Sequence, residues 1–150
     1  MQHLKEKLYQ HCQRAIAEQI AAAKRGIDEA DEAVKSETKG SAGDKHETGR
    51  AMIHLEKEQH IRRLNEALAN EKVLQNIDPT QACNEVIEGA VVQTSVSNYF
   101  FAISAGKLSI DGKEYLTISL SSPLGEELEG CEQGDVISFR GKELKITTVF

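Results

Sequence analysis

The chain has 150 residues, a net charge of −6, 39% hydrophobic residues and 28% charged residues, which is typical of one ordinary folded domain or two small ones. No apolar run approaches about 20 residues, which excludes a membrane-spanning helix, and the negative charge disfavours generic binding along nucleic acid. The first residues form no apolar signal segment, and the three cysteines show no Cys-x-x-Cys spacing. We therefore expect a cytoplasmic protein without a membrane partner, a disulfide framework or a zinc site.

The composition changes at Asp78-Pro79. All five histidines lie before this point, and six of the seven aromatic residues lie after it. The first part is rich in helix-forming Ala, Glu, Lys, Leu and Gln, whereas the second is rich in Val, Ile, Thr, Ser, Phe and Gly. Because proline tends to stop a helix, we expect two domains, residues 1–78 and 79–150.

The first part begins with a stretch that predicts a long helix. Its apolar residues recur every three or four positions. From Ile20 onward the steps of three and four alternate strictly, as along the seam of a coiled coil. The series is Leu4, Leu8, Cys12, Ile16, Ile20, Ala23, Ile27, Ala30 and Val34. The alanines would allow a partner helix to approach closely.

A second helical stretch, residues 44–75, follows a polar turn that contains two glycines. Its apolar residues are Ile53, Ile61, Leu64, Leu68 and Leu74. Two helices of similar length around one short loop are expected to fold back as an antiparallel hairpin with its tip at about residues 36–48. An intermolecular coiled coil, with the loop as an interruption, is the alternative. As one helix the second stretch would be ~48 Å long, which is long enough to reach into a partner.

Two carboxylates begin this second stretch. Asp44 and Glu47 are three residues apart and would share one face of a helix. They are interpreted either as a capping box that stabilises the helix start or as an incomplete Mg²⁺ site. Mg²⁺ needs about six oxygen ligands, so a partner would have to supply the others. We expect His46, between the two acids, to be a bystander at the surface rather than a base or a ligand.

The second part predicts a small sheet with one short helix. The strand-like stretches are residues 90–94, 99–103, 115–120, 136–139 and 144–149. Asp111-Gly112 predicts a hairpin turn, and Ser122-Pro123 followed by acids predicts the start of a helix that Gly130 would end. The expected fold is therefore α+β: a helical hairpin followed by a small antiparallel β domain with a short helix. No nucleotide-binding loop or hydrolase nucleophile motif is present.

A set of motif residues in the second part resembles a known family. The matching residues are Ile118-Ser119, Ser122-Pro123-Leu124-Gly125, Leu128, Gly130 and Gly134-Asp135-Val136. In order and spacing they resemble the signature of the Gre family of bacterial transcript cleavage factors. Gly89-Ala90-Val91-Val92 is similar to the strand that opens the family's second domain, and Gly43-Asp44-x-x-Glu47 is similar to the tip of its helical hairpin. The resemblance covers roughly residues 30 to 149.

The resemblance implies a transcription elongation factor that binds RNA polymerase. In this family an FKBP-like second domain docks at the rim of the polymerase secondary channel, and the hairpin enters the channel. Asp44 and Glu47 match the family's acidic positions, so they would be the catalytic residues and would hold Mg²⁺ jointly with the polymerase. The chain would be no enzyme itself, because it stimulates the polymerase to cleave the 3′ end of backtracked nascent RNA. We expect a monomer.

The tip departs from the family pattern Gly-Asp-Leu-Ser-Glu-Asn-Ala-Glu-Tyr. Lys45, His46 and Thr48 stand where the family has Leu, Ser and Asn, and Ala51 stands at the tyrosine position. A regulator that occupies the polymerase channel without RNA cleavage is therefore one alternative. A prolyl-isomerase-like or chaperone binding module with a helical handle is another, disfavoured by the absence of Trp and the small number of aromatic residues.

Overall fold

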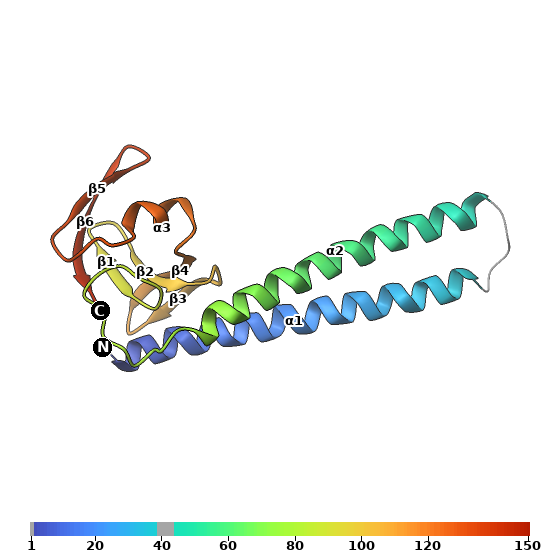
Figure 1. Cartoon of the computed structure of the whole chain (residues 1–150), viewed down its shortest axis with the longest axis horizontal. Coiled ribbons are helices and arrows are strands. Elements are labelled where there is room, and N and C mark those ends of the chain that lie inside the picture. The colour runs from blue at the N-terminus through green and yellow to red at the C-terminus, as the bar shows by residue number, and fades with distance from the viewer. Residues whose placement is uncertain (1, 39–43) are drawn as a thin grey trace. The chain divides into compact units, whose positions relative to one another are not determined.

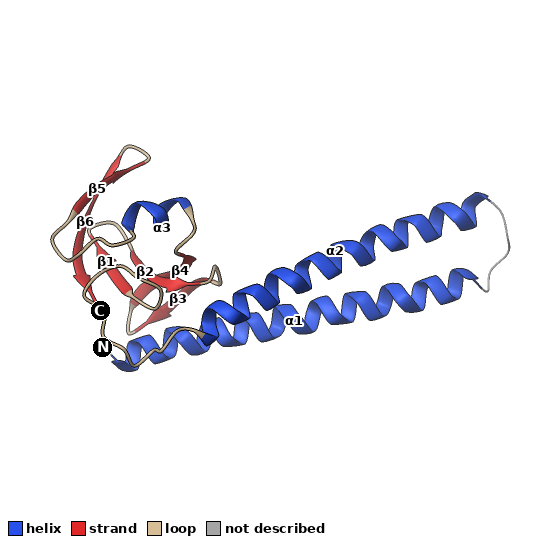
Figure 2. Ribbon diagram, viewed as in Figure 1, coloured by secondary structure: helices blue, strands red, loops and turns tan. Residues whose placement is uncertain are grey.

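The structure, a computed structural model, describes residues 2–38 and 44–150. At residues 37, 38 and 44–46 it describes the backbone alone. Two long helices come first, and six strands with one short helix follow (Figures 1 and 2). The fold class is therefore α+β, as the sequence predicts. None of the described helices combines the length and the apolar character needed to cross a membrane.

The elements have the following bounds. The helices are α1 (Gln2–Thr38), α2 (Asp44–Gln75) and α3 (Pro123–Leu128). The strands are β1 (Val91–Thr94), β2 (Asn98–Ala102), β3 (Gly106–Ile110), β4 (Lys113–Ser119), β5 (Val136–Phe139) and β6 (Lys142–Val149). The bounds of α2 coincide with the predicted second helical stretch.

The chain divides into two compact units. The first comprises Met1–Ala15 and Glu71–Phe150, and the second comprises Ile16–Asn70. Each long helix thus contributes residues to both units. Asp78-Pro79 lies inside the first unit, and a domain boundary at that point stays a prediction.

The six strands of the first unit form one mixed sheet in the order β3-β4-β2-β1-β6-β5. Four neighbouring pairs are antiparallel, but β2 and β4 run parallel, with Phe100 opposite Thr117. The prediction of an antiparallel sheet is therefore wrong at this pair. The reason is that the β3–β4 hairpin follows β2 in the chain and its second strand, not its first, pairs with β2, which leaves β3 at the edge.

Both faces of the central strands are buried. On one face Phe101, Ile146 and Leu128 of α3 belong to a single apolar cluster and are fully buried. On the other, Phe100 and Cys12 of α1 are fully buried, and the opposing Thr117 is 1% exposed and donates from its hydroxyl to the Gly106 backbone oxygen at 2.8 Å. Sheets covered on both faces have continuous rather than alternating apolar strands, which explains the run from Tyr99 to Ile103.

The beginning of α1 is tied to the rest of the first unit by polar contacts as well. The Tyr9 hydroxyl donates to the backbone oxygen of Leu74, at 2.8 Å. The His11 Nε2 atom lies 3.0 Å from the backbone oxygen of Ala105, to which it donates. Residues far apart in the sequence therefore close the first unit.

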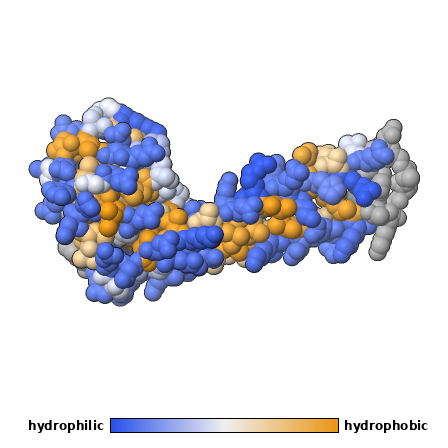
Figure 3. All heavy atoms as spheres, viewed as in Figure 1, coloured by the Kyte–Doolittle hydropathy of each residue, from blue (hydrophilic) through white to orange (hydrophobic). Residues whose placement is uncertain are grey.

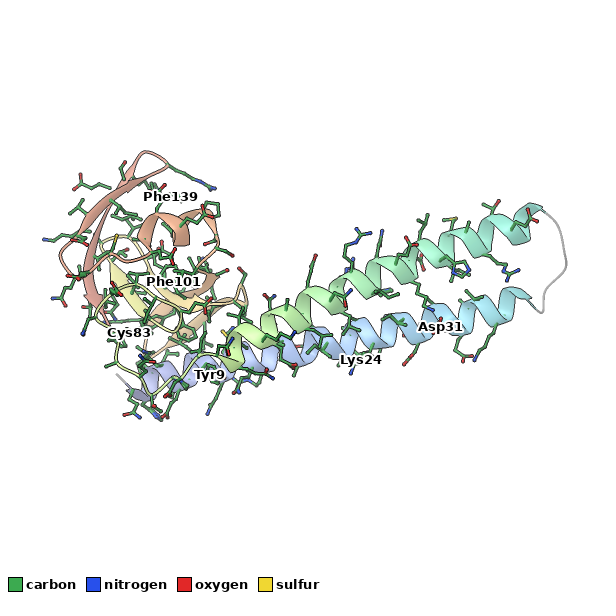
Figure 4. All side chains as sticks on the ribbon, in the orientation of Figure 1. Tyr9, Lys24, Asp31, Cys83, Phe101 and Phe139 are labelled. Carbon is green, nitrogen blue, oxygen red and sulfur yellow. The ribbon has the colours of Figure 1, made fainter. Side chains whose placement is uncertain are left out.

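In the second unit, α1 and α2 pack side by side and run in opposite directions. Lys57 Nζ of α2 lies 2.6 Å from Asp31 Oδ1 of α1, and His60 of α2 faces Gly26 of α1 (Figure 4 labels Asp31). Small residues dominate the buried part of this contact: Ala23, Gly26, Ala30 and Ala67. Such residues permit a short separation between two helix axes.

The contacting face of α2 differs from its predicted apolar series. Ile61 and Leu68 are each 38% exposed, whereas Lys57 and His60 are half-buried. Most of the shielded positions of α2 recur at alternating steps of three and four: Arg50, Ile53, Lys57, His60, Leu64, Ala67, Glu71 and Leu74. That spacing follows the seam of an antiparallel pair, so register against α1, rather than hydropathy, decides which residues are shielded.

Gly26 of α1 lies directly against the side chain of His60 of α2. A Cβ atom added there would fall on the imidazole ring of His60, well inside contact distance. We predict that Gly26→Ala lowers the free energy of unfolding by about 1–3 kcal/mol, because overpacking outweighs the better helix propensity of alanine. In a His60→Ala background, the same change should instead raise it by about 0.5–1 kcal/mol. Urea unfolding of the four chains measures both effects, and the same sign in both backgrounds would contradict the steric explanation.

Cys12 is fully buried, and burial raises the pKa of its thiol to about 11, against opposing hydrogen bonds from Ile103 and Thr117. A pKa raised by folding stabilises the native state below the thiol's unfolded pKa, and this stabilisation is lost as the pH rises through the folded value. Between about pH 7 and about pH 10, the wild type should lose on the order of 1 kcal/mol more stability than Cys12→Ala. A Val92→Ala variant, which also removes buried atoms but no thiol, should lose as much as the wild type. Equal losses in Cys12→Ala and wild type would refute this assignment.

Candidate functional site

The two predicted site acids lie in the first turn of α2. Asp44 is its first residue, and Glu47 follows three positions later, so the helical backbone places both on one face. The Glu47 side chain is exposed. The side chains of Asp44, Lys45 and His46 lie outside the described residues, so the choice between capping box and metal site stays a prediction.

The Glu47 carboxylate is open to a partner. Among the side chains that the structure describes, none forms an ion pair with it. The described ion pairs of the second unit lie elsewhere, between Lys35 and Glu32 and between Lys57 and Asp31. An exposed carboxylate at a helix start keeps its oxygens available for a cation or a water molecule.

The described residues contain no group of three or more His, Cys, Asp or Glu side chains that could hold a metal ion. Asp44 and Glu47 would together supply carboxylate oxygens, which are ligands that Mg²⁺ prefers, but too few for its shell of about six. The donor set therefore fits Mg²⁺ only as part of a site shared with a partner.

The residues that carry the family resemblance form the turn and cap of α3. Ser122 is the N-cap: its hydroxyl accepts from the Gly125 N–H at 3.1 Å and donates to the Ser119 backbone oxygen at 2.6 Å. Pro123 occupies the first turn, where its missing N–H costs nothing. Leu128, the last residue of α3, is fully buried.

The motif requires glycine at three positions, for steric reasons at one and for conformational reasons at two. A Cβ atom on Gly125 would fall on the backbone oxygens of Leu120 and Ser119. Gly130 and Gly134 have φ values of +80° and +95°, which side-chain-bearing residues rarely adopt. Every motif residue described here thus has a structural task, so the motif indicates a local fold more directly than an activity.

The described surface carries open hollows, of which two are lined largely by polar and charged side chains. One in the first unit, of about 290 Å³, is lined by Lys7, Gln10, Arg14, Leu108, Ser109, Ile110 and Asp111. One in the second unit, of about 320 Å³, is lined by Gln59, Arg62, Arg63 and Glu66. Figure 3 shows hydrophilic side chains over much of the surface, with apolar ones gathered between the two helices of the second unit. Neither hollow brings a nucleophile together with a base, which favours a role in binding over a catalytic pocket of the chain's own.

Sequence reasoning missed two features that the structure brings out. Lys5 is buried beside Cys83, although lysine is rarely buried and Cys83 is 78 residues away along the chain. Gly26 sits inside the helix contact, although it does not belong to the apolar series. The one sequence signal for this contact was the glycine itself. Glycine inside a long helix lowers helix stability, so its presence there indicates a packing requirement.

A scan against protein-family models and searches of curated proteins and of solved structures found no match to this chain. Membership of the Gre family therefore stays a prediction that rests on the motif residues.

The packing of Gly125 gives a test of the motif's structural task. We predict that Gly125→Ala lowers the free energy of unfolding by about 2 kcal/mol or more, because backbone atoms of the preceding turn cannot give way as a flexible side chain can. Glu126→Ala on the same helix, which replaces an exposed side chain, should change it by less than about 0.5 kcal/mol. Chemical denaturation provides the measurement, and equal effects of the two substitutions would count against the steric role of Gly125.

Proposed function

We propose that this chain is a Gre-like transcription elongation factor that binds RNA polymerase. In this proposal α1 and α2 form a coiled-coil hairpin that enters the secondary channel, and an FKBP-like domain of the β-sheet docks at the channel rim. The observation that carries this proposal is the start of α2: Asp44 and Glu47 lie in its first turn, α2 runs antiparallel to α1, and Glu47 is exposed. The motif around α3, read as a family resemblance, supports the same assignment.

The two acids would complete a metal site of the polymerase. Asp44 and Glu47 would hold Mg²⁺ together with ligands of the polymerase, and that metal would stabilise negative charge developing on the phosphate oxygens of the RNA. A carboxylate that is not bound to metal through both oxygens can also accept a hydrogen bond from the attacking water and so orient it. The catalytic centre belongs to the polymerase, so the chain alone would cleave no RNA.

The sequence at the tip favours a second candidate, a regulator that occupies the same channel without cleavage. Lys45 lies between the two acids in the sequence, so the first turn of α2 carries a positive charge besides its two negative ones. An ammonium group next to a carboxylate competes with a cation for its oxygens. The two candidates share the binding surface and differ only in chemistry.

The aromatic residues speak against a prolyl-isomerase-like or chaperone module. Tyr99 and Phe101 belong to the core cluster and are 7% and 0% exposed. The half-buried Phe139 has the Arg140 guanidinium 5.0 Å from its ring centroid. Tyr99 and Phe101 therefore belong to the core and Phe139 packs against Arg140, rather than lining an apolar peptide pocket.

Removal of the two negative charges tests the proposal. In a purified backtracked elongation complex with Mg²⁺, the wild type should shorten the RNA, and the Asp44→Asn/Glu47→Gln variant should do so at least about tenfold more slowly, because metal sites lose that much even when an outer-shell partner is removed. Glu58→Gln, farther along α2 and also exposed, is the matched control and should retain full cleavage. The RNA length on a denaturing gel and the binding of each variant to the polymerase are measured in parallel.

The outcomes separate the candidates. A wild type that binds polymerase but shortens no RNA at any Mg²⁺ concentration would establish the non-cleaving regulator. Cleavage by the double variant at the wild-type rate would refute the role of the acids. Absence of any binding to polymerase would overturn both candidates.

A further inference from the structure

Lys5 lies buried in the first unit with its amine against a sulfur atom. Its side chain is one of the two buried polar or charged ones in the described structure, and the residue is 3% exposed. The Nζ atom donates to the backbone oxygen of Gln81 at 2.6 Å and lies 3.5 Å from the Sγ atom of Cys83, which is 6% exposed (Figure 4 labels Cys83). The backbone hydrogen bond thus holds the amine in van der Waals contact with the thiol.

No carboxylate neutralises this lysine. In the part of the chain that the structure describes, none lies within ion-pair distance of its amine. Asp78 is a neighbour whose pKa is lowered mainly by hydrogen bonds from Thr80, and the charge of Lys5 is the weakest cause. Burial of an ammonium group without a carboxylate is costly, and one backbone oxygen and one sulfur are unusual surroundings for it.

The three thiols of the chain differ sharply in their surroundings. Burial raises the pKa of Cys12 to about 11, and burial together with the charges of Asp135 and Glu127 raises the pKa of Cys131. Only Cys83 has a cationic side chain in contact with its sulfur among the described residues. A sulfenic acid formed at Cys83 by peroxide would therefore have a nitrogen nucleophile, the Lys5 amine, directly beside it.

We propose that Lys5 and Cys83 form a site of oxidative cross-linking, in which peroxide joins the lysine nitrogen to the cysteine sulfur. The proposal is independent of the function proposed above.

The chemistry has two balanced steps. In the first, the Cys83 sulfur attacks hydrogen peroxide, the O–O bond breaks, and the products are a sulfenic acid and one water; sulfur is oxidised by two electrons and peroxide is reduced. In the second, the neutral Lys5 amine attacks the same sulfur, the S–O bond breaks, and the departing hydroxide leaves as water with a proton from the nitrogen. This forms a sulfenamide, Cys–S–NH–Lys, a known product when sulfenic acids condense with nitrogen. A lysine that starts as ammonium releases one further proton to solvent.

The position of the pair gives the bond a structural consequence. It joins residues separated by 78 positions, one in the first turns of α1 and the other after the end of α2. A cross-link that closes so long a loop removes much conformational freedom from the unfolded chain. The oxidised protein should therefore melt at a higher temperature than the reduced protein, and a dithiol reductant should reverse the change.

The test uses the full chain, first reduced and then treated with hydrogen peroxide. After removal of peroxide, the protein is unfolded, its remaining thiols are alkylated, and the intact mass and the tryptic peptides are measured. We expect the loss of two hydrogens, alkylation of Cys12 and Cys131 but not Cys83, and one peptide pair linked through Lys5 and Cys83. The linked pair should disappear after dithiothreitol, in Lys5→Met and in Cys83→Ser, and it should persist in Cys131→Ser.

The wild-type peptide map decides the matter even if a variant fails to fold, because trypsin cleaves after a free Lys5 but not after a linked one. Recovery of Cys83 as an alkylated thiol, or as sulfinic acid with Lys5 still cleavable, would overturn the proposal. A bridge that retains an oxygen atom between nitrogen and sulfur would also contradict it, since the condensation written above expels that oxygen. Persistence of the mass change in Lys5→Met would exclude the lysine as the nucleophile.

Discussion

The close contact of α1 with α2 in the second unit is the constraint on which the proposed function depends. A pair of slender helices has no layered core, so its stability rests on one seam, and Ala23, Gly26 and Ala30 are the buried small residues on the α1 side of it. The α2 side contributes long polar side chains instead, His60 against Gly26 and Lys57 paired with Asp31. A small residue opposite a large one keeps the axes close while the polar groups retain partners. The result is a helical pair that leaves most of its surface charged.

The same seam explains why apolar residues on α2 are poor guides to its buried face. Met52 and Leu55 are each 60% exposed, and Ile61 and Leu68 are also exposed. Periodicity read from apolar residues alone finds only part of a seam in which Ile53, Leu64 and Leu74 alternate with arginine, lysine, histidine and glutamate stems. On α1, where the seam residues are apolar or small, the same reasoning correctly places Ile16, Ala23 and Ala30 in the contact.

Local chemistry made other parts of the fold predictable. Asp111 and Gly112, with φ values of +52° and +78°, form the turn that their dipeptide predicts, and Ser122 caps α3 as expected. These features depend on residues within a few positions of one another. The parallel pairing of β2 with β4 and the burial of Lys5 beside Cys83 depend on partners that no local pattern names. Long-range pairing is settled by how the whole sheet buries its faces, which short motifs do not encode.

The candidate site was predictable in a different way, because it is recognised by the ligands it lacks: two carboxylates supply only part of the shell that Mg²⁺ needs. The spacing of Asp44 and Glu47 can be read from the sequence, and the structure adds that both lie in the first turn of α2 and that Glu47 is exposed. The motif around α3, by contrast, is accounted for by caps, close packing and positive φ angles, so it indicates the local fold around α3 without supplying chemistry.

An incomplete metal site also sets when the proposed chemistry can occur. Two carboxylates at the start of one helix leave several positions of a Mg²⁺ shell to water, so the free chain would bind the ion weakly and activate nothing. Ligands of a polymerase active centre, together with the phosphate oxygens of a misplaced RNA end, would complete the shell only when the helical pair is fully inserted. Cleavage would then be confined to the complex that needs it, since the acids lack the ligands to act alone and the polymerase lacks the acids. The charge of Lys45 would bear on this balance: if its ammonium pairs with Asp44 or Glu47 in the free chain, the metal has to displace it, and the lysine then sets how strongly the polymerase site must bind Mg²⁺ before cleavage begins.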